Sequence, residues 1–159
     1  MKTLKEISPA LIAVILLSAA VWFVTSETRT PNAALVKAGR DLKVKSLMTG
    51  KQNAVLQRAA EEHAAYQARV EVQGHQGFEK RVAQLRKLLP DYSEFSEVCN
   101  ESWQGQSIED AAKEMYNSWR KSPGHWSAVN GKCDYWGYAM VKGENGVWYA
   151  CAIFAKVRK

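Results

Sequence analysis

The sequence lacks the short motifs of the common catalytic sites. It contains no HExxH zinc motif, no CxxC pair, no GxSxG nucleophile motif, no P-loop and no dinucleotide-binding fingerprint. Repeats and low-complexity tracts are absent as well. Proline and glycine are scarce, with four and ten in 159 residues, while 47% of the residues are hydrophobic. This composition excludes a collagen-like or disordered chain, and the length predicts one globular domain with short appendages.

Excess positive charge is missing from most of the chain, although the net charge is +6. Residues 59–159 hold thirteen basic and thirteen acidic residues. The excess lies in residues 27–58, with seven basic and two acidic residues, and in residues 1–26, with two and one. Because a nucleic-acid-binding fold carries its basic patch on the fold itself, this distribution predicts no nucleic-acid partner.

The one long apolar run lies at the N-terminus. Residues 10–24 read ALIAVILLSAAVWFV and follow Lys2 and Lys5. A basic start followed by such a run is typical of a secretory signal, and the run is shorter than the ~20 residues of a membrane-crossing helix. Residues 1–26 are therefore predicted to form a hydrophobic signal or anchor helix, which places the protein outside the cytoplasm, secreted or membrane-anchored. Residues 27–54 are basic, show no sustained period and are predicted to be a linker.

Three helices are predicted where apolar residues recur at helical spacing. They cover residues 54–70, residues 78–89, which Pro90 ends, and a segment that begins after the N-cap Ser107 and that Pro123 ends. Residues 134–141 and 147–157 are rich in aromatic and β-branched residues and flank an Asn-Gly turn, which is a strong hairpin signal. Helices followed by a terminal antiparallel hairpin predict an α+β fold.

Cysteine is also rare. In an extracytoplasmic protein Cys99, Cys133 and Cys151 allow one disulfide and one free thiol. Cys151 lies in the middle of a predicted strand, where a free cysteine behaves as a small buried hydrophobe. The possible disulfide is therefore Cys99–Cys133, and the alternative is three reduced thiols. No histidine stands beside Cys99 in the sequence to activate it as a catalytic thiol.

The three histidines, His63, His75 and His125, lie in blocks that resemble the CAP superfamily, which comprises cysteine-rich secretory, antigen 5 and pathogenesis-related-1 proteins. The similar blocks, in the family's order, are residues 56–64, which end in His-Ala, residues 74–81 with His75, residues 100–105, and residues 119–125, which read WRKSPGH. The last block is very like the bacterial form of the family's second histidine block. The final segments, residues 136–139 and 148–154, resemble the family's last strands.

The resemblance implies that residues 55–159 form an α-β-α sandwich of CAP type with a cleft lined by two histidines and two acidic residues. By position the histidines are His75 and His125, and in the family they can hold a divalent cation such as zinc. The first acid is Glu101, with Glu97 as a competing alignment. The position of the second acid is taken by Ser122, which departs from the family pattern.

The expected function is binding rather than catalysis. The family includes sterol and lipid binders, and the last third of this chain is rich in Trp and Tyr. We therefore expect an exported domain that binds a small molecule, lipid, glycan or cell-surface protein at this cleft. The alternative is a metal-dependent hydrolase acting on extracellular protein or cell-wall substrates, because a metal-bound water can act as a nucleophile.

Overall fold

The computed structural model describes residues 32–159. The predicted signal or anchor helix, residues 1–26, lies outside the described residues. Within the described part, no helix combines the length and the apolar character needed to cross a membrane.

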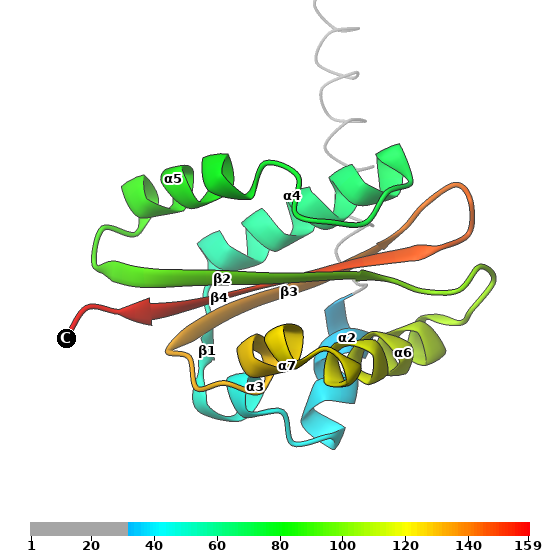
Figure 1. Ribbon diagram of the computed structural model, residues 1–159, viewed down its shortest axis with the longest axis horizontal. Helices are drawn as coiled ribbons and strands as arrows, with labels where there is room; N and C mark the ends of the chain where they lie inside the picture. The colour runs from blue at the N-terminus through cyan, green and yellow to red at the C-terminus, as the bar shows by residue number, and fades with distance from the viewer. Residues whose placement is uncertain (1–31) are drawn as a thin grey trace, which may run out of the picture. The chain divides into compact units, whose positions relative to one another are not determined.

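A four-stranded sheet in the order β1-β3-β4-β2 forms the middle of the domain (Figure 1). The short β1 pairs in parallel with β3, whereas β3 with β4 and β4 with β2 pair antiparallel. The strands are β1 (Lys51–Gln52), β2 (Tyr92–Glu101), β3 (Tyr135–Lys142) and β4 (Trp148–Val157). The predicted hairpin is confirmed as β3–β4, while β2 lies at one edge of the sheet.

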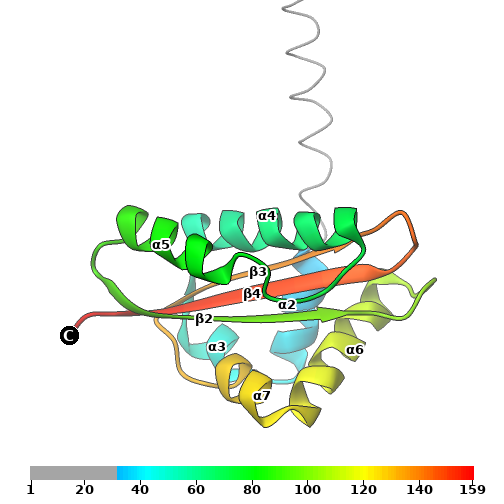
Figure 2. The ribbon, with the colours of Figure 1, turned by 45° about the horizontal axis from the view of Figure 1, so that its top comes forward.

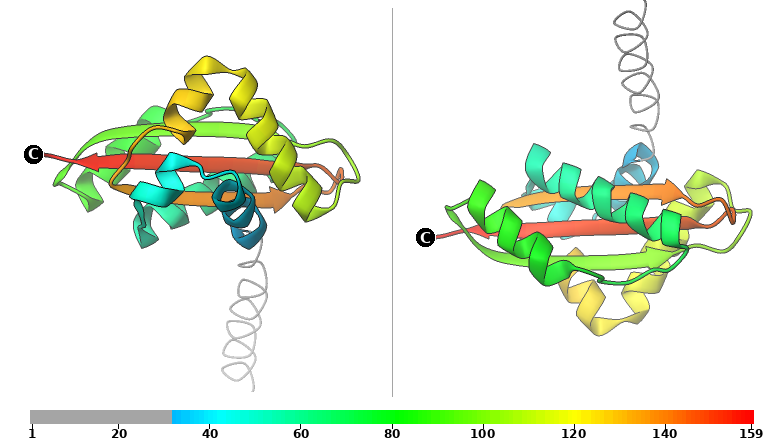
Figure 3. Two further views of the ribbon diagram at one scale, coloured as in Figure 1. Left: turned by 90° about the horizontal axis from the view of Figure 1, so that it is seen from below. Right: turned by 90° about the horizontal axis from the view of Figure 1, so that it is seen from above.

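Helices cover both faces of this sheet, so the domain has three layers (Figure 2, Figure 3). One face carries α4 (Ala54–Val70) and α5 (Phe78–Leu88). The other carries α2 (Asn32–Asp41), α3 (Lys45–Thr49), α6 (Ile108–Lys121) and α7 (Pro123–Val129). Two separate apolar clusters fill the two spaces between helices and sheet. The predicted α+β class is confirmed.

Local signals explain where the helices begin and end. The Asn53 side chain accepts hydrogen bonds from the amides of Val55 and Leu56 and so caps α4, and Ser107 caps α6 in the same way. The three predicted helices are confirmed as α4, α5 and α6. Pro123 does end α6 as expected, but it also opens α7, because proline suits the first turn of a helix.

The predicted linker is wrong for residues 32–54, which belong to the folded domain. They form α2, α3 and β1, and the side chains of Leu35 and Val44 are fully buried in the cluster under α6. Residues 32–54 accordingly belong to the same compact unit as the rest of the described chain. The segment shows little periodicity because it is built from two short helices, whose partners in α6 and β3 come from distant parts of the sequence.

The predicted Cys99–Cys133 disulfide is also wrong. All three cysteines are free and buried. Cys99 and Cys151 belong to the apolar cluster under α4, whereas Cys133 belongs to the cluster under α6. The sheet therefore separates Cys99 from Cys133, and the alternative of three reduced thiols describes the structure.

Candidate functional site

A buried carboxylate, Glu97 of β2, lies at the centre of the candidate site. Its side chain is 1% exposed. The Arg81 guanidinium of α5 donates to both carboxylate oxygens, with Nε 2.8 Å from Oε2 and Nη2 2.8 Å from Oε1. The Nδ1 atom of His75, in the loop between α4 and α5, lies 3.0 Å from Oε1. Two cationic partners thus compensate the cost of burying this charge.

His63 holds the loop that carries His75. It lies on the buried stripe of α4, and its Nε2 atom donates to the carbonyl oxygen of Gly74 over 2.7 Å. The Gly74 amide in turn donates to the side-chain oxygen of Gln67, also on α4, over 3.0 Å. Gly74 has a φ of 146°, which favours glycine. The helix α4 therefore fixes the start of the loop, and the position of His75 follows from it.

Cys99 lies two residues after Glu97 and points to the same face of the sheet, as the period of a strand requires. Its Sγ atom is 3.7 Å from Oε1 of Glu97. The hydrogen bond from the Cys151 thiol, followed by those from His63 and His75, lowers the pKa of Cys99 below its ordinary value although burial opposes this. Cys133, on the other face, has its pKa raised to about 11 by burial.

His75 and His125 come together at the edge of the sheet. Their ring centroids are 6.2 Å apart, although His125 lies in α7, on the opposite face from α4 and α5. The His75 side chain is 46% exposed. Its pKa is raised to about 9, first by the hydrogen bond to Cys99 and then by the one to Glu97, against the effect of burial.

Glu101 and Glu97, the two residues predicted as the first acid of the cleft, lie at different places on β2. Glu97, not Glu101, contacts His75. Glu101 is the last residue of β2 and its side chain is exposed. Ser122 lies between α6 and α7, where its carbonyl oxygen accepts from the amide of Trp126. The structure thus joins three of the five predicted cleft residues, His75, Glu97 and His125.

Three side chains of the site bring together atoms that could hold a metal ion. The side chains of His63, Glu97 and Cys99 are all buried and bring their ligand atoms within 4.8 Å of one another. Two of these groups already have protein partners, however, because Arg81 occupies both oxygens of Glu97 and Gly74 accepts from His63. An ion at this position would have to compete with the Arg81 guanidinium for the carboxylate.

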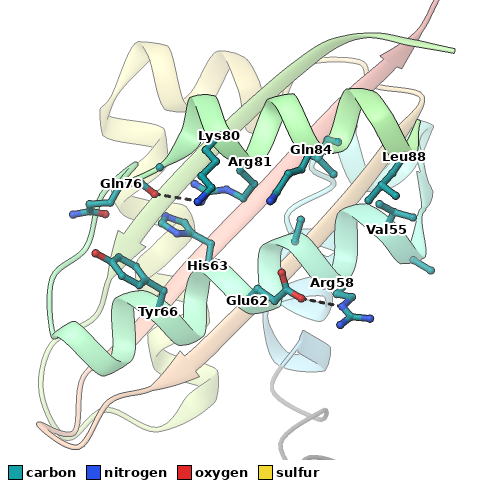
Figure 4. Close-up of a pocket in the computed structure, with 14 residues that line it drawn as sticks. Val55, Arg58, Glu62, His63, Tyr66, Gln76, Lys80, Arg81, Gln84 and Leu88 are labelled. Atoms are coloured by element: carbon teal, nitrogen blue, oxygen red, sulfur yellow. Dashed lines mark hydrogen bonds and ion pairs between the residues drawn. The ribbon is translucent and has the colours of Figure 1, made fainter. Parts of the chain in front are cut away.

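A groove of about 810 Å³ lies between α4 and α5 (Figure 4). Its walls combine apolar side chains, among them Ala59, Leu85 and Leu88, with the cationic side chains of Arg58 and Lys80. It reaches inward to His63 and Arg81, so it meets the Glu97 cluster. The lining residues are Ala54, Val55, Arg58, Ala59, Glu62, His63, Tyr66, Gln76, Gly77, Lys80, Arg81, Gln84, Leu85 and Leu88.

Three residues of the site were not identified from the sequence, namely His63, Arg81 and Cys151. His63 continues the apolar stripe of α4 at helical spacing, which was a usable sign that it faces the sheet. The sequence holds no comparable sign for Cys151. This residue lies beside Cys99 only because of the register in which β4 pairs with β2, and local sequence does not show that register.

Comparison with known proteins shows the fold alone. No protein-family model matches the chain, and no curated protein matches it either. The solved structure of an outer surface protein from Borrelia burgdorferi is similar, with a TM-score of 0.58 and 17% sequence identity. The match covers 80% of this chain and 90% of that one.

Proposed function

We propose that this chain is an exported binding domain of CAP type that takes an amphipathic ligand with an anionic head group, such as a fatty acid, in the groove between α4 and α5. The observation that carries the proposal is the groove itself. Its volume of about 810 Å³ is typical of small-molecule sites, and its walls combine apolar side chains with polar and charged ones.

The distribution of charge around the groove favours an anionic head group. Arg58 is neutralised by Glu62, whose Oε1 is 2.9 Å from its Nε, and Arg81 by Glu97. Lys80 makes no ion pair among the described residues and lines the same groove, so its ammonium group is available for a ligand carboxylate. Ala59, Leu85 and Leu88 would then contact the apolar chain of the ligand, whose burial supplies most of the affinity.

Separate observations support the proposed CAP type and the proposed place outside the cytoplasm. The three-layer arrangement and the proximity of His75, His125 and Glu97 are what the resemblance implies. The similar solved protein is called an outer surface protein, which supports a place outside the cytoplasm. A divalent cation such as zinc, held by His75 and His125, stays a prediction, as does the hydrolase alternative that depends on such an ion.

Titration of the full chain with dansyl-labelled undecanoic acid, followed by fluorescence, tests the ligand proposal. We expect saturable binding that Lys80→Ala weakens about fivefold, since a partly exposed ion pair contributes about 1 kcal/mol. Ala59→Phe fills the groove and should abolish binding. Leu88→Asn, at an exposed position that folding does not depend on, should weaken it.

Lys113→Ala is the matched control, because this lysine is exposed on α6, on the other side of the sheet. Circular dichroism establishes that each variant is folded. The proposal is wrong if the wild-type chain shows no saturable binding, or if binding by folded Ala59→Phe and Leu88→Asn equals that of the wild type.

A further inference from the structure

Cys99 and Cys151 lie directly opposite each other on the antiparallel strands β2 and β4. Both side chains are buried in the same apolar cluster, on the side of the sheet covered by α4 and α5. The chain has one other cysteine, Cys133, and it lies on the opposite face. The fold therefore builds one pair of neighbouring thiols and leaves the third thiol apart.

The hydrogen bonds of the sheet show which kind of pair this is. The Ser102 amide donates to the carbonyl oxygen of Trp148 over 2.9 Å, so these opposite residues form a hydrogen-bonded pair. Because such pairs alternate along an antiparallel ladder, the pair three residues further along, Cys99 with Cys151, is not hydrogen-bonded. The bonding of the Cys99 carbonyl oxygen is consistent with this assignment, because it accepts from the Trp119 indole over 3.2 Å and not from β4.

That geometry is compatible with a disulfide. In a pair without backbone hydrogen bonds the two Cα atoms are about 4.5 Å apart and the side chains approach most closely. Disulfides span Cα separations of about 4.4–6.8 Å. A bond between Cys99 and Cys151 would thus form without a change of strand register.

The two thiols have different surroundings. Cys99 adjoins the buried side chains of His63 and Glu97, and its thiol donates to Oε1 of Glu97 over 3.7 Å. Cys99 is 3% exposed, whereas Cys151 is fully buried. Cys99 is therefore the thiol that meets a small reagent first, and Cys151 is the one placed to react with Cys99.

We propose that Cys99 and Cys151 are a redox-active dithiol, which a hydroperoxide converts into a cross-strand disulfide. In the first step the Cys99 sulfur attacks one peroxide oxygen. A sulfur–oxygen bond forms, the oxygen–oxygen bond breaks, and the leaving alkoxide, or hydroxide in the case of hydrogen peroxide, takes the proton that the thiol gives up. In the second step the Cys151 sulfur attacks the resulting sulfenic acid, a sulfur–sulfur bond forms, and the hydroxyl leaves as water with the thiol proton. The dithiol loses two electrons and the hydroperoxide gains them.

The experiment treats the reduced full chain with one equivalent of hydrogen peroxide in the presence of a chelator. Remaining thiols are alkylated, and peptides are mapped by mass spectrometry. We expect a peptide pair linked through Cys99 and Cys151, with Cys133 alkylated. The native chain should form this pair alone, whereas the chain in urea should also form bonds to Cys133, because unfolding removes the strand register that holds Cys99 opposite Cys151.

Three cysteine-to-alanine variants separate the roles. Cys133→Ala should form the disulfide at the wild-type rate and is the matched control. Cys151→Ala should stop at a sulfenic acid on Cys99, which dimedone traps, and Cys99→Ala should leave Cys151 reduced. The proposal is overturned if Cys99 and Cys151 of the wild type stay reduced or form bonds to Cys133. It is equally overturned if the native chain links Cys99 to Cys151 no more selectively than the chain in urea does, a result that needs no variant to fold.

Discussion

At the scale of single residues, the site depends on how Glu97 is compensated. A carboxylate whose side chain is 1% exposed persists because Arg81 and His75 donate to it. The choice between Glu97 and Glu101 could not be made from the sequence. Both residues lie on one face of β2, and only the position of His75, held through Gly74 by α4, distinguishes them.

The Glu97→Gln variant tests this account. The change leaves the Arg81 guanidinium, 14% exposed, beside a neutral amide, and removing one member of a buried ion pair is strongly destabilising. We expect the free energy of unfolding to fall by about 3 kcal/mol, measured by urea unfolding with tryptophan fluorescence.

Glu94→Gln is the control on the same strand. Glu94 pairs with Lys156 at 2.7 Å on the surface, where both side chains are largely exposed, so its loss should change stability by less than about 1 kcal/mol. Equal effects of the two substitutions would contradict the role assigned to the buried pair.

At the scale of elements, helix α4 approaches the sheet most closely over Gly137 of β3. A Cβ atom built at Gly137 would lie 2.3 Å from the backbone carbon of Leu56 and 2.4 Å from the amide nitrogen of Gln57. The element boundaries of α4, α5 and the β3–β4 hairpin could be predicted, since apolar spacing and turn residues are local. The closeness of α4 to β3 could not, because it depends on a glycine whose neighbours are some eighty residues away in the chain.

Gly137→Ala should therefore push α4 away from the sheet. Backbone atoms cannot move aside as a flexible side chain can, and overpacking of this kind costs about 3 kcal/mol. Thermal unfolding measures the loss. Gly124→Ala, at a position where an added Cβ meets nothing within 4 Å, should be close to neutral. Equal unfolding temperatures of the two variants would contradict the close packing of α4 on β3 at Gly137.

At the scale of the whole molecule, the folded domain is larger than the predicted residues 55–159, and it carries more positive charge than they do. Residues 32–54 are part of it, so the folded part carries nineteen basic and fourteen acidic residues. The prediction of no nucleic-acid partner assumed that the folded domain has no net charge, and that assumption is wrong. The absence of a nucleic-acid partner stays a prediction. A fragment that begins at residue 55 would lack Leu35 and Val44, which fill the core under α6.

The Leu35→Ala variant tests whether this segment supports the fold. Leu35 is fully buried, and truncation of a buried leucine leaves a cavity that costs about 3 kcal/mol. Leu42→Ala, in the same segment but 40% exposed, should cost less than about 1 kcal/mol. Urea unfolding gives both values, and a Leu35 variant as stable as the Leu42 variant would mean that residues 32–54 are dispensable.

By itself the sequence determined the α+β class, three of the six described helices, the terminal hairpin and the two histidines that meet at the edge of the sheet. These features follow from local spacing, caps and turns, or from a resemblance carried by short blocks. The tertiary structure decided the start of the domain, the choice of Glu97 and the pairing of Cys99 with Cys151. Each of these depends on contacts between segments far apart in the chain, which strand register and helix packing create and local sequence does not record.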